Sequence, residues 1–253
     1  MPVPVTPKAE ANLTEMCSSI QGEGILVGCR QIFLRFAECN LNCRYCDTDF
    51  SKTEFCRVEP LSNAGPIELI ANPVGQESLL KLVDHWCREA PGVHHSISLT
   101  GGEPLLQQQT LAEWLPQLRK LLPIYLETNG TLPELLAPLL AHLDWISMDI
   151  KLHSQTGLTT DWDVHRRFLQ LANKRNCYVK VVVGVTTPDS ELRMAAELIT
   201  EVSKNIPLIL QPVTVGHKVS VSPQRLMAMQ QRVAAIHENV RIIPQTHVFM
   251  NLI

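Results

Sequence analysis

The chain has 253 residues, a mass of 28.4 kDa and a formal net charge of −3, with 45% hydrophobic and 19% charged residues. This length fits one α/β domain with a full core. Neither a basic face for nucleic acid nor an apolar run that could cross a bilayer is indicated, so we expect a small-molecule substrate. The start, Met1–Val5, lacks an export pattern, which predicts a cytoplasmic location.

Short β-branched and aromatic runs alternate with longer segments of helical period. In chain order, the predicted strands are Ile32–Ala37, Ser96–Leu99, Ile124–Glu127, Trp145–Ile150, Tyr178–Val183, Leu208–Pro212 and Val240–Pro244. The predicted helices are Glu77–Glu89, Leu105–Leu122, Leu132–His142, Trp162–Asn176, Ser190–Ile206 and Ser222–Ile236. The stretch Glu59–Gly75, rich in proline and glycine, is predicted to be a long loop.

This βαβα order predicts a parallel sheet, either open and doubly wound or closed into a barrel. Because there are six units rather than eight, a partial (β/α)6 barrel is favoured, open on one side, with an additional C-terminal strand and a single domain over residues 1–253. Ligands bind at the carboxyl ends of parallel strands in both folds. Polar segments follow the predicted strands there, namely the cysteine loop, Thr100–Pro104, Thr128–Gly130 and Lys151.

Three cysteines, Cys39, Cys43 and Cys46, are spaced as Cys-x3-Cys-x2-Cys. Three thiolates can hold a cubane iron–sulfur cluster and leave one iron open to a small molecule. A structural zinc site is an alternative, but it needs four ligands and no second close cysteine pair occurs. Disulfides are disfavoured in a reducing cytosol. The remaining cysteines are scattered, and most are expected to be buried: Cys17, Cys29, Cys56, Cys87 and Cys177.

The loop Gly101-Gly102-Glu103-Pro104 follows the second predicted strand. It could be a plain turn, because glycine and proline punctuate loops generally. At this position, however, two glycines would let a ligand approach bare backbone, and Glu103 could accept a hydrogen bond from an ammonium group. The loop is therefore predicted to hold an amino-acid moiety beside the cluster.

The cysteine spacing, with Tyr45 before the last cysteine, and the Gly-Gly-Glu-Pro loop together resemble the radical S-adenosylmethionine (SAM) superfamily. That resemblance implies that SAM chelates the open iron of a 4Fe-4S cluster through its amino and carboxylate groups. Reductive cleavage of SAM would then give a 5′-deoxyadenosyl radical, which abstracts hydrogen from the substrate, so that no side chain is assigned as catalytic.

Several further segments resemble one family in this superfamily, the 7-carboxy-7-deazaguanine synthases of queuosine biosynthesis. They are Ser19–Gly24, Arg35-Phe36, Cys46-Asp47-Thr48 and Gln245-Thr246-His247. The resemblance implies conversion of 6-carboxy-5,6,7,8-tetrahydropterin to 7-carboxy-7-deazaguanine with loss of ammonia, by a homodimer that takes electrons from flavodoxin or ferredoxin.

The resemblance also implies site residues. Gln21 and Glu23 suit the donor and acceptor edge of a pterin, and Arg35 suits its carboxylate. Thr48 is implied as a Mg²⁺ ligand. The other implied substrate contacts are Gly22, Thr100, His247 and the terminal carboxylate of Ile253. The implied SAM contacts are Tyr45, Asp47, Gly101, Gly102, Glu103, Glu127, Asp149, Lys151 and Gln211.

The implied segments are 13–30 and 240–253 for the substrate and 47–76 as an insertion after the cluster loop. The ending departs from the family pattern at Val248 and Asn251, where lysine and glycine are usual. Two alternatives stay open. A glycyl-radical activating enzyme shares the cysteine spacing but has no need of Gln21, Glu23 and Thr48, and a non-catalytic zinc-binding protein could keep the fold.

Overall fold

The computed structural model describes residues 9–46, 49–61 and 65–252. Within these residues, ten strands form one sheet in the order β14-β11-β10-β9-β8-β7-β3-β2-β4-β5. The parallel part consists of β3 (Arg30–Phe36), β7 (Ser96–Gly101), β8 (Ile124–Thr128), β9 (Trp145–Asp149), β10 (Asn176–Val183), β11 (Leu208–Pro212) and β14 (Val240–Ile242). At the other end, β2 (Leu13–Ile20) runs antiparallel to β3, followed by β4 (Phe55–Val58) and β5 (Glu68–Ala71).

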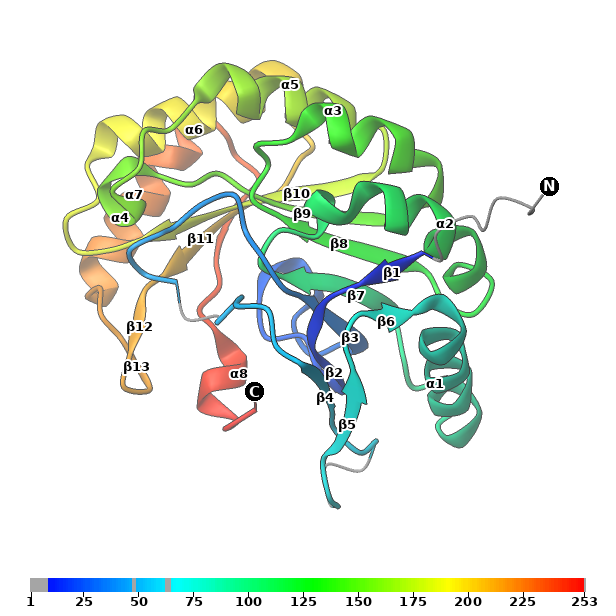
Figure 1. Cartoon of the computed structure of the whole chain (residues 1–253). Coiled ribbons are helices and arrows are strands. Elements are labelled where there is room, and N and C mark those ends of the chain that lie inside the picture. Colours follow the sequence, from blue (N-terminus) through cyan, green and yellow to red (C-terminus); the bar gives the residue numbers. More distant parts are fainter. Residues whose placement is uncertain (1–8, 47–48, 62–64, 253) are drawn as a thin grey trace.

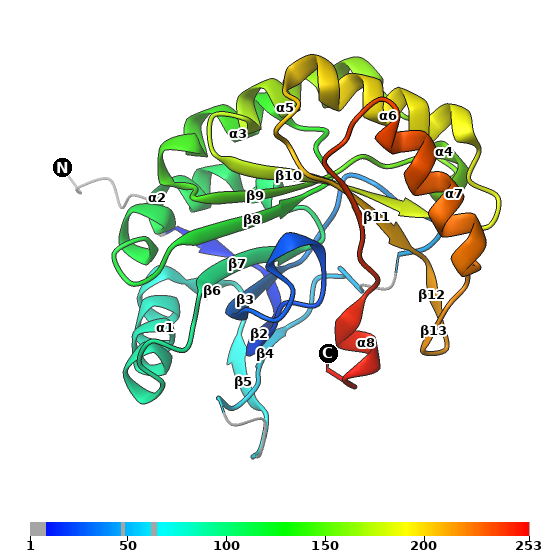
Figure 2. The same ribbon diagram turned by 180° about the vertical axis from the view of Figure 1, so that it is seen from behind.

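The helices cover one face of this sheet (Figure 1). They are α1 (Gln76–Glu89), α2 (Gln108–Leu118), α3 (Pro133–Leu136), α5 (Trp162–Ala172), α6 (Asp189–Val202) and α7 (Pro223–Ala234), with the short α4 (His153–Thr156). The chain after β14 crosses to the other side of the sheet and ends in α8 (Thr246–Phe249), as the view from behind shows (Figure 2). In the described residues, no helix is long and apolar enough to cross a membrane.

The sheet does not close into a barrel. Its outermost strands in the described residues are β14 and β5, and β2 occupies the edge of β3 that a closing strand would need. The predicted partial barrel, open on one side and with an additional C-terminal strand, is therefore confirmed. One side of the sheet remains free for a cavity.

The predicted strands are present, with differences at their ends. So are the predicted helices, except that Leu132–His142 is α-helical only over Pro133–Leu136 and continues as a 3-10 helix over Ala137–His142. The helix predicted over Leu105–Leu122 is shorter, because a 3-10 turn (Pro104–Gln107) precedes α2, and Pro116 lies in its second half. Ser222 caps α7 by accepting a hydrogen bond from the backbone N–H of Arg225 at 3.3 Å. The helix α6 begins one residue before its predicted start, at Asp189.

The prediction of a long loop over Glu59–Gly75 is wrong in part. Two short strands lie within it, β5 and β6 (Val74–Gly75), and β6 pairs with β1 (Glu10–Ala11). The side chains of β5 are largely exposed, so the segment has no apolar alternation from which a strand could be predicted. The strand β2 was also missed, although its side chains are almost continuously buried.

Successive residues of β10 point to opposite faces of the sheet. Val179, Val181 and Val183 pack in the large core between the sheet and the helices. Tyr178 belongs to a smaller buried cluster, and Lys180 and Val182 line the cavity on the other face. The same strand thus supplies both core and site.

Trp114 of α2 joins the helix layer to the N-terminal part of the described chain. Its side chain is fully buried, its indole N–H donates to the carbonyl of Ala9 at 3.1 Å, and its ring lies 6.3 Å from that of Phe36. We expect Trp114→Ala to lower the free energy of unfolding by about 3–5 kcal/mol, measured by urea titration. The exposed Met227→Ala should change it by less than about 0.5 kcal/mol, and similar effects for the two variants would contradict this packing role.

Candidate active site

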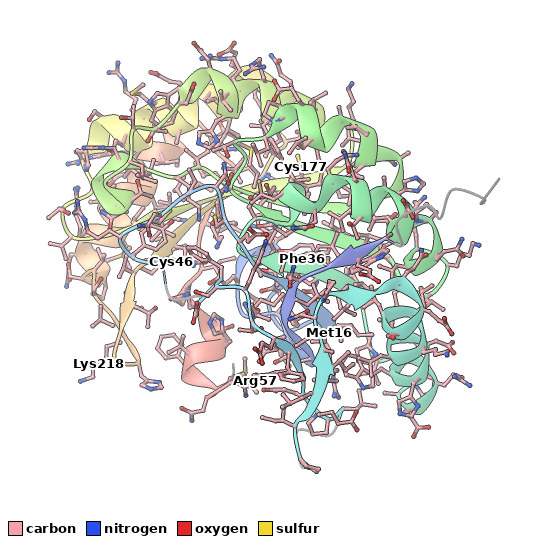
Figure 3. All side chains as sticks on the ribbon, in the orientation of Figure 1. Met16, Phe36, Cys46, Arg57, Cys177 and Lys218 are labelled. Carbon is pink, nitrogen blue, oxygen red and sulfur yellow. The ribbon has the colours of Figure 1, made fainter. Side chains whose placement is uncertain are left out.

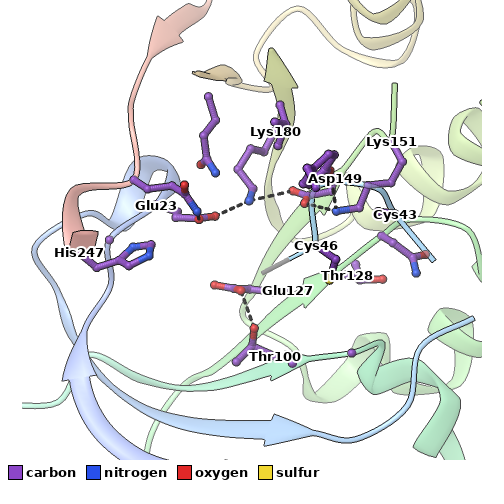
Figure 4. Close-up of a pocket in the computed structure, with 18 of the residues that line it drawn as sticks. Glu23, Cys43, Cys46, Thr100, Glu127, Thr128, Asp149, Lys151, Lys180 and His247 are labelled. Carbon is purple, nitrogen blue, oxygen red and sulfur yellow. Dashed lines mark hydrogen bonds and ion pairs between the residues drawn. The ribbon is translucent and has the colours of Figure 1, made fainter. Parts of the chain in front are cut away.

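A cavity of about 290 Å³ opens on the face of the sheet opposite the helices, at the carboxyl ends of the parallel strands. It is lined by residues of the cysteine loop, of the parallel strands β3, β7, β8, β9, β10 and β11, of the segment around the end of β2, of the segment that follows β11 and of the C-terminal segment. They include Gln21, Gly22, Glu23, Arg35, Cys39, Cys43, Tyr45, Cys46, Thr100, Gly101, Gly102, Glu127, Asn129, Asp149, Lys151, Lys180, Gln211, Thr214, Gln245 and His247. Segments far apart in sequence therefore meet at one place, and the close-up shows many of them (Figure 4).

The loop that carries the three cysteines is tied to two neighbouring loops. Asn40 donates to Thr131 at 2.9 Å and accepts from the side-chain amide of Asn129 at 2.8 Å. The backbone N–H of Arg44 donates to the carbonyl of Thr156, at the end of α4, at 3.1 Å. These bonds fix the loop at the cavity rim.

The donors around Cys39 suit a metal-bound thiolate. The backbone N–H of Leu41 lies 3.4 Å from its Sγ and the amide of Asn129 lies 4.0 Å away. Hydrogen bonds to ligand sulfurs are a regular feature of iron–sulfur sites. No disulfide links the cysteines, all eight of which lie in the described ranges. The set therefore fits an iron–sulfur cluster.

A structural zinc ion would need a fourth ligand beside Cys39, Cys43 and Cys46. Zinc needs its donors about 2.0–2.3 Å from one centre. Among residues 9–46, 49–61 and 65–252, no three His, Cys, Asp or Glu side chains converge in that way. A cubane distributes its ligands over several irons, so it does not require such convergence.

The scattered cysteines do not contribute to the cavity. Cys17, Cys56 and Cys177 are buried, and Cys29 and Cys87 are partly buried. Cys177 packs between the sheet and the helices, well away from Cys46 (Figure 3). The prediction that most of these thiols are buried is confirmed.

The Gly-Gly-Glu loop packs directly against the start of the cysteine loop. A side chain at Gly102 would overlap the carbonyl oxygen of Glu38, and one at Gly101, which has φ +107°, would lie 2.5 Å from backbone atoms of Phe36. The backbone N–H of Glu103 donates to the Glu38 carbonyl at 2.8 Å. Both glycines line the cavity as predicted, and both are also needed for this contact.

Glu103 lies beneath the cavity and is not among the residues that line it. Its carboxylate is fully buried and accepts from the backbone N–H of Leu105 and Asn129 and from the hydroxyl of Thr128, at 2.8–3.1 Å. Burial raises its pKa to about 7 in spite of these bonds. Its acceptor capacity is thus used by protein donors in this arrangement, and the contact with a ligand ammonium stays a prediction. Glu103 joins the loop after β7 to the loop after β8.

The ends of β8 and β9 supply charged groups to the cavity wall. Glu127 accepts from Thr100 at 2.7 Å and from Gln21 at 2.8 Å, and burial raises its pKa. Lys151 lies 2.8 Å from Asp149 and 3.3 Å from the hydroxyl of Tyr45. Burial opposes the charge of Lys151, but these partners raise its pKa above the ordinary value.

Two of the predicted substrate residues, Glu23 and His247, lie on the same side of the cavity (Figure 4). The backbone N–H and hydroxyl of Thr246 both donate to the carbonyl of Gly22, at 2.8 and 3.0 Å. A side chain at Gly22 would overlap the His247 ring. Gln245 donates to Glu23 at 2.9 Å. The C-terminal segment is therefore docked on the Gln-Gly-Glu segment.

Arg35, on β3, lines the same cavity and forms an ion pair with a residue of β2. Its Nε lies 3.2 Å from a carboxylate oxygen of Glu15, the residue opposite it on β2. The Arg35 side chain keeps 24% of its surface exposed, so part of the guanidinium remains free for a ligand. A carboxylate on that ligand would match it.

Two polar atoms on the wall have no hydrogen-bond partner within the described part of the chain. They are the buried side-chain oxygens of Gln211 and Thr214, both at the β11 end of the cavity. A buried polar group without a partner is costly. A ligand with suitable donors would satisfy them.

Three predicted site residues, Asp47, Thr48 and Ile253, lie outside the described residues. Apart from Glu103, the described ones all line the cavity. Lys180 and Asn129 were missed. Lys180 had a signal, since it is the one charged residue in the apolar run Cys177–Val183, and lone charges on buried strands are rare.

Comparison with known proteins agrees with this geometry. Residues 35–199 match the Radical SAM superfamily. The chain is 48% identical to the 7-carboxy-7-deazaguanine synthase of Geobacter sulfurreducens, over 96% of this chain and 98% of that protein. It is 37% identical to the synthase of Methanothermobacter thermautotrophicus, over 94% and 96% of the two chains.

Among solved structures, QueE from Escherichia coli has the same fold, with a TM-score of 0.60 at 20% identity, over 94% of this chain and 95% of that one. Streptococcus suis SuiB bound to S-adenosylmethionine has a TM-score of 0.54 at 14% identity, over 83% and 49% of the two chains. The fold and the relatives lead to the same assignment. The chain belongs to the radical SAM superfamily and, within it, to the family of 7-carboxy-7-deazaguanine synthases.

Proposed function

We propose that this protein converts 6-carboxy-5,6,7,8-tetrahydropterin to 7-carboxy-7-deazaguanine with release of ammonia, in the biosynthesis of queuosine. The observation that carries the proposal is one cavity that joins Cys39, Cys43 and Cys46 to Gln21 and Glu23. Relatives that bear the synthase name over nearly the full length support it. They do not favour a glycyl-radical activating enzyme or a zinc-binding protein.

The cysteine side of the cavity would hold a 4Fe-4S cluster through Cys39, Cys43 and Cys46. When bound, the reduced cluster and SAM supply a one-electron cleavage that starts hydrogen abstraction from the substrate. The amides of Leu41 and Asn129 would stabilise the sulfur of Cys39.

SAM would lie between the cysteine loop and the strand ends. Gly101 and Gly102 present bare backbone there, and Glu127, Asp149 and Lys151 present charge. The partnerless oxygen of Gln211 can accept from a nucleoside N–H or hydroxyl. Tyr45, against the Lys151 ammonium, would exclude water from the same region, and we keep Asp47 as an expected contact. Glu103 would stabilise the position of the loops after β7 and β8, which it joins, beside SAM.

The pterin would lie on the other side, against Gln21, Gly22, Glu23, Thr100 and His247. A pterin edge presents N–H donors beside a carbonyl acceptor, and a carboxylate with an amide can match such an edge. Arg35 would pair with the substrate carboxylate. Ile253 is a further proposed contact.

A radical SAM enzyme also needs a reductant, and we propose flavodoxin or ferredoxin for this role. A homodimer, a cytoplasmic location and one radical SAM domain over residues 1–253 are further parts of the proposal. The family resemblance supports the homodimer and the single domain. The sensitivity of iron–sulfur clusters to oxygen supports the cytoplasmic location. We also propose Mg²⁺, held by Thr48 and substrate oxygens, since this ion accepts few protein ligands.

Anaerobic assay of the reconstituted protein with SAM, reductant and pterin should give 7-carboxy-7-deazaguanine, detected by mass spectrometry. Cys43→Ala should lose this activity and part of its iron, because a cubane needs all three thiolates. Cys87→Ala, on α1 and outside the cavity lining, is the matched control and should keep both. A wild-type protein with iron, sulfide and no product would refute the proposed reaction.

Gly22→Ala should raise the KM for the pterin by about tenfold or more, because the new methyl group would displace His247. The affinity for SAM should change little. Gly75→Ala is the control, since Gly75 has φ −87° and no atom closer than 3.9 Å to an added Cβ. An unchanged pterin KM in Gly22→Ala would contradict the placement of substrate beside His247.

Chelation should lower kcat/KM for the pterin, and added Mg²⁺ should restore it. Thr48→Ala should lower kcat/KM by about tenfold or more and weaken this response, because the ligand hydroxyl is lost. Thr48→Ser keeps the hydroxyl and should retain most of the activity. Equal Mg²⁺ responses in wild type and Thr48→Ala would refute this metal site.

A further inference from the structure

Lys180 is a buried cation that the assignments above leave without a role. It lies on the central strand β10, between β9 and β11, and is 9% exposed. Burying an ammonium group is costly unless oppositely charged groups surround it. The groups around the Lys180 ammonium should therefore include carboxylates that offset the cost of burying it.

Two carboxylates from different parts of the chain meet at Lys180. Its Nζ forms an ion pair with Glu23, from the loop after β2, and lies 3.4 Å from Asp149, the residue opposite it on β9. Asp149 in turn pairs with Lys151 at 2.8 Å. The close-up shows the resulting row, Glu23, Lys180, Asp149 and Lys151, in which negative and positive charges alternate (Figure 4).

This row runs from one ligand region to the other. Glu23 lies at the end where His247 and the proposed pterin site are found, and Lys151 lies at the end near Cys43 (Figure 4). Resting on the proposed function, we propose that Lys180 is a positioning residue that holds Glu23 ionised and in place as the acceptor for the pterin edge, and anchors it to Asp149 on the SAM side.

The charge state of Glu23 agrees with this role. Burial alone would raise the pKa of its carboxyl group, but Lys180 and Gln245 lower it to about 2. The carboxylate is then ionised throughout the neutral and mildly acidic range. Without Lys180, burial would dominate and the pKa would rise, so that Glu23 would take up a proton as the pH falls and could no longer accept from two pterin N–H groups.

Other titratable groups face the Glu23–Lys180 pair, and their protonation also changes with pH. Glu127 lies on β8, Asp149 on β9, Tyr178 on β10 and His247 on α8. Lys151 and Tyr45 face Asp149 from the cavity rim. The informative quantity is the ratio of the two dissociation constants at each pH. Because Lys180 also lowers the pKa of Glu127 and pairs with Asp149, a pH-dependent ratio is assigned to Glu23 by a variant that replaces Glu23 as well.

The test uses the cluster-loaded protein and 6-carboxypterin, a stable pterin with the same recognition edge, in anaerobic calorimetric titrations from about pH 5 to 7.5. We expect Lys180→Met to weaken binding relative to wild type by at least tenfold at the acid end. The ratio should change by up to about tenfold per pH unit below the raised pKa of Glu23. Lys180→Arg, which keeps the charge, should restore a ratio that does not depend on pH.

Two further variants assign the effect. In Glu23→Gln/Lys180→Met the pH dependence of the ratio should disappear, because the glutamine cannot ionise. This double variant removes both charges of the buried ion pair and so leaves no unpaired Glu23 carboxylate. It therefore keeps the test valid if Lys180→Met alone is unstable. Lys151→Met removes the other ammonium beside Asp149 but has no contact with Glu23, so it should leave the ratio for pterin independent of pH.

The outcomes separate the two proposals. A wild type that binds 6-carboxypterin and forms product, with a pH-independent ratio for Lys180→Met, would overturn the role of Lys180 alone. The same conclusion follows if the pH dependence persists in Glu23→Gln/Lys180→Met. A wild type that neither binds the pterin nor forms product would overturn the proposed function, and the role of Lys180 with it.

Discussion

The close approach of two loops at the carboxyl ends of β3 and β7 is the contact on which the site depends. Gly102 lies so near the carbonyl of Glu38 that no side chain fits between them, and the N–H of Glu103 donates to that same carbonyl. Glu103 then joins this pair of loops to the loop after β8. The cysteine loop thereby takes its position from backbone contacts with the loop after β7.

Charge is the second constraint. The cavity wall holds the carboxylates of Glu23, Glu127 and Asp149 and the ammonium groups of Lys151 and Lys180, all substantially buried. Such groups stabilise each other only when they alternate at short distance, since each is costly to bury alone. The parallel register achieves this, because Lys180 and Asp149 are direct neighbours on adjacent strands. A preorganised polar wall needs little rearrangement when ligands bind.

Much of the site could be predicted from short motifs, because residues close in sequence stay close in space. The cysteine loop, the two glycines and the segment from Gln21 to Glu23 all line the cavity. Motifs do not settle which partners Glu103 takes. A carboxylate beside two glycines can turn toward a ligand or toward protein donors, and here Leu105 of its own loop and Thr128 and Asn129 at the end of β8 donate to it. Lys180 was missed because its two partners are distant in sequence.

The sequence by itself determined the alternation of strands and helices, the open parallel sheet and the cysteine spacing, because these depend on local apolar period and on short motifs. Only the tertiary structure decided that β2 runs antiparallel beside β3, that the C-terminal segment docks on Gly22, and that Glu23 and Asp149 share Lys180. The contacts of Gly22 with the C-terminal segment and of Glu23 with Lys180 join residues far apart in the chain. Their energy depends on distance and burial, which residue order does not specify.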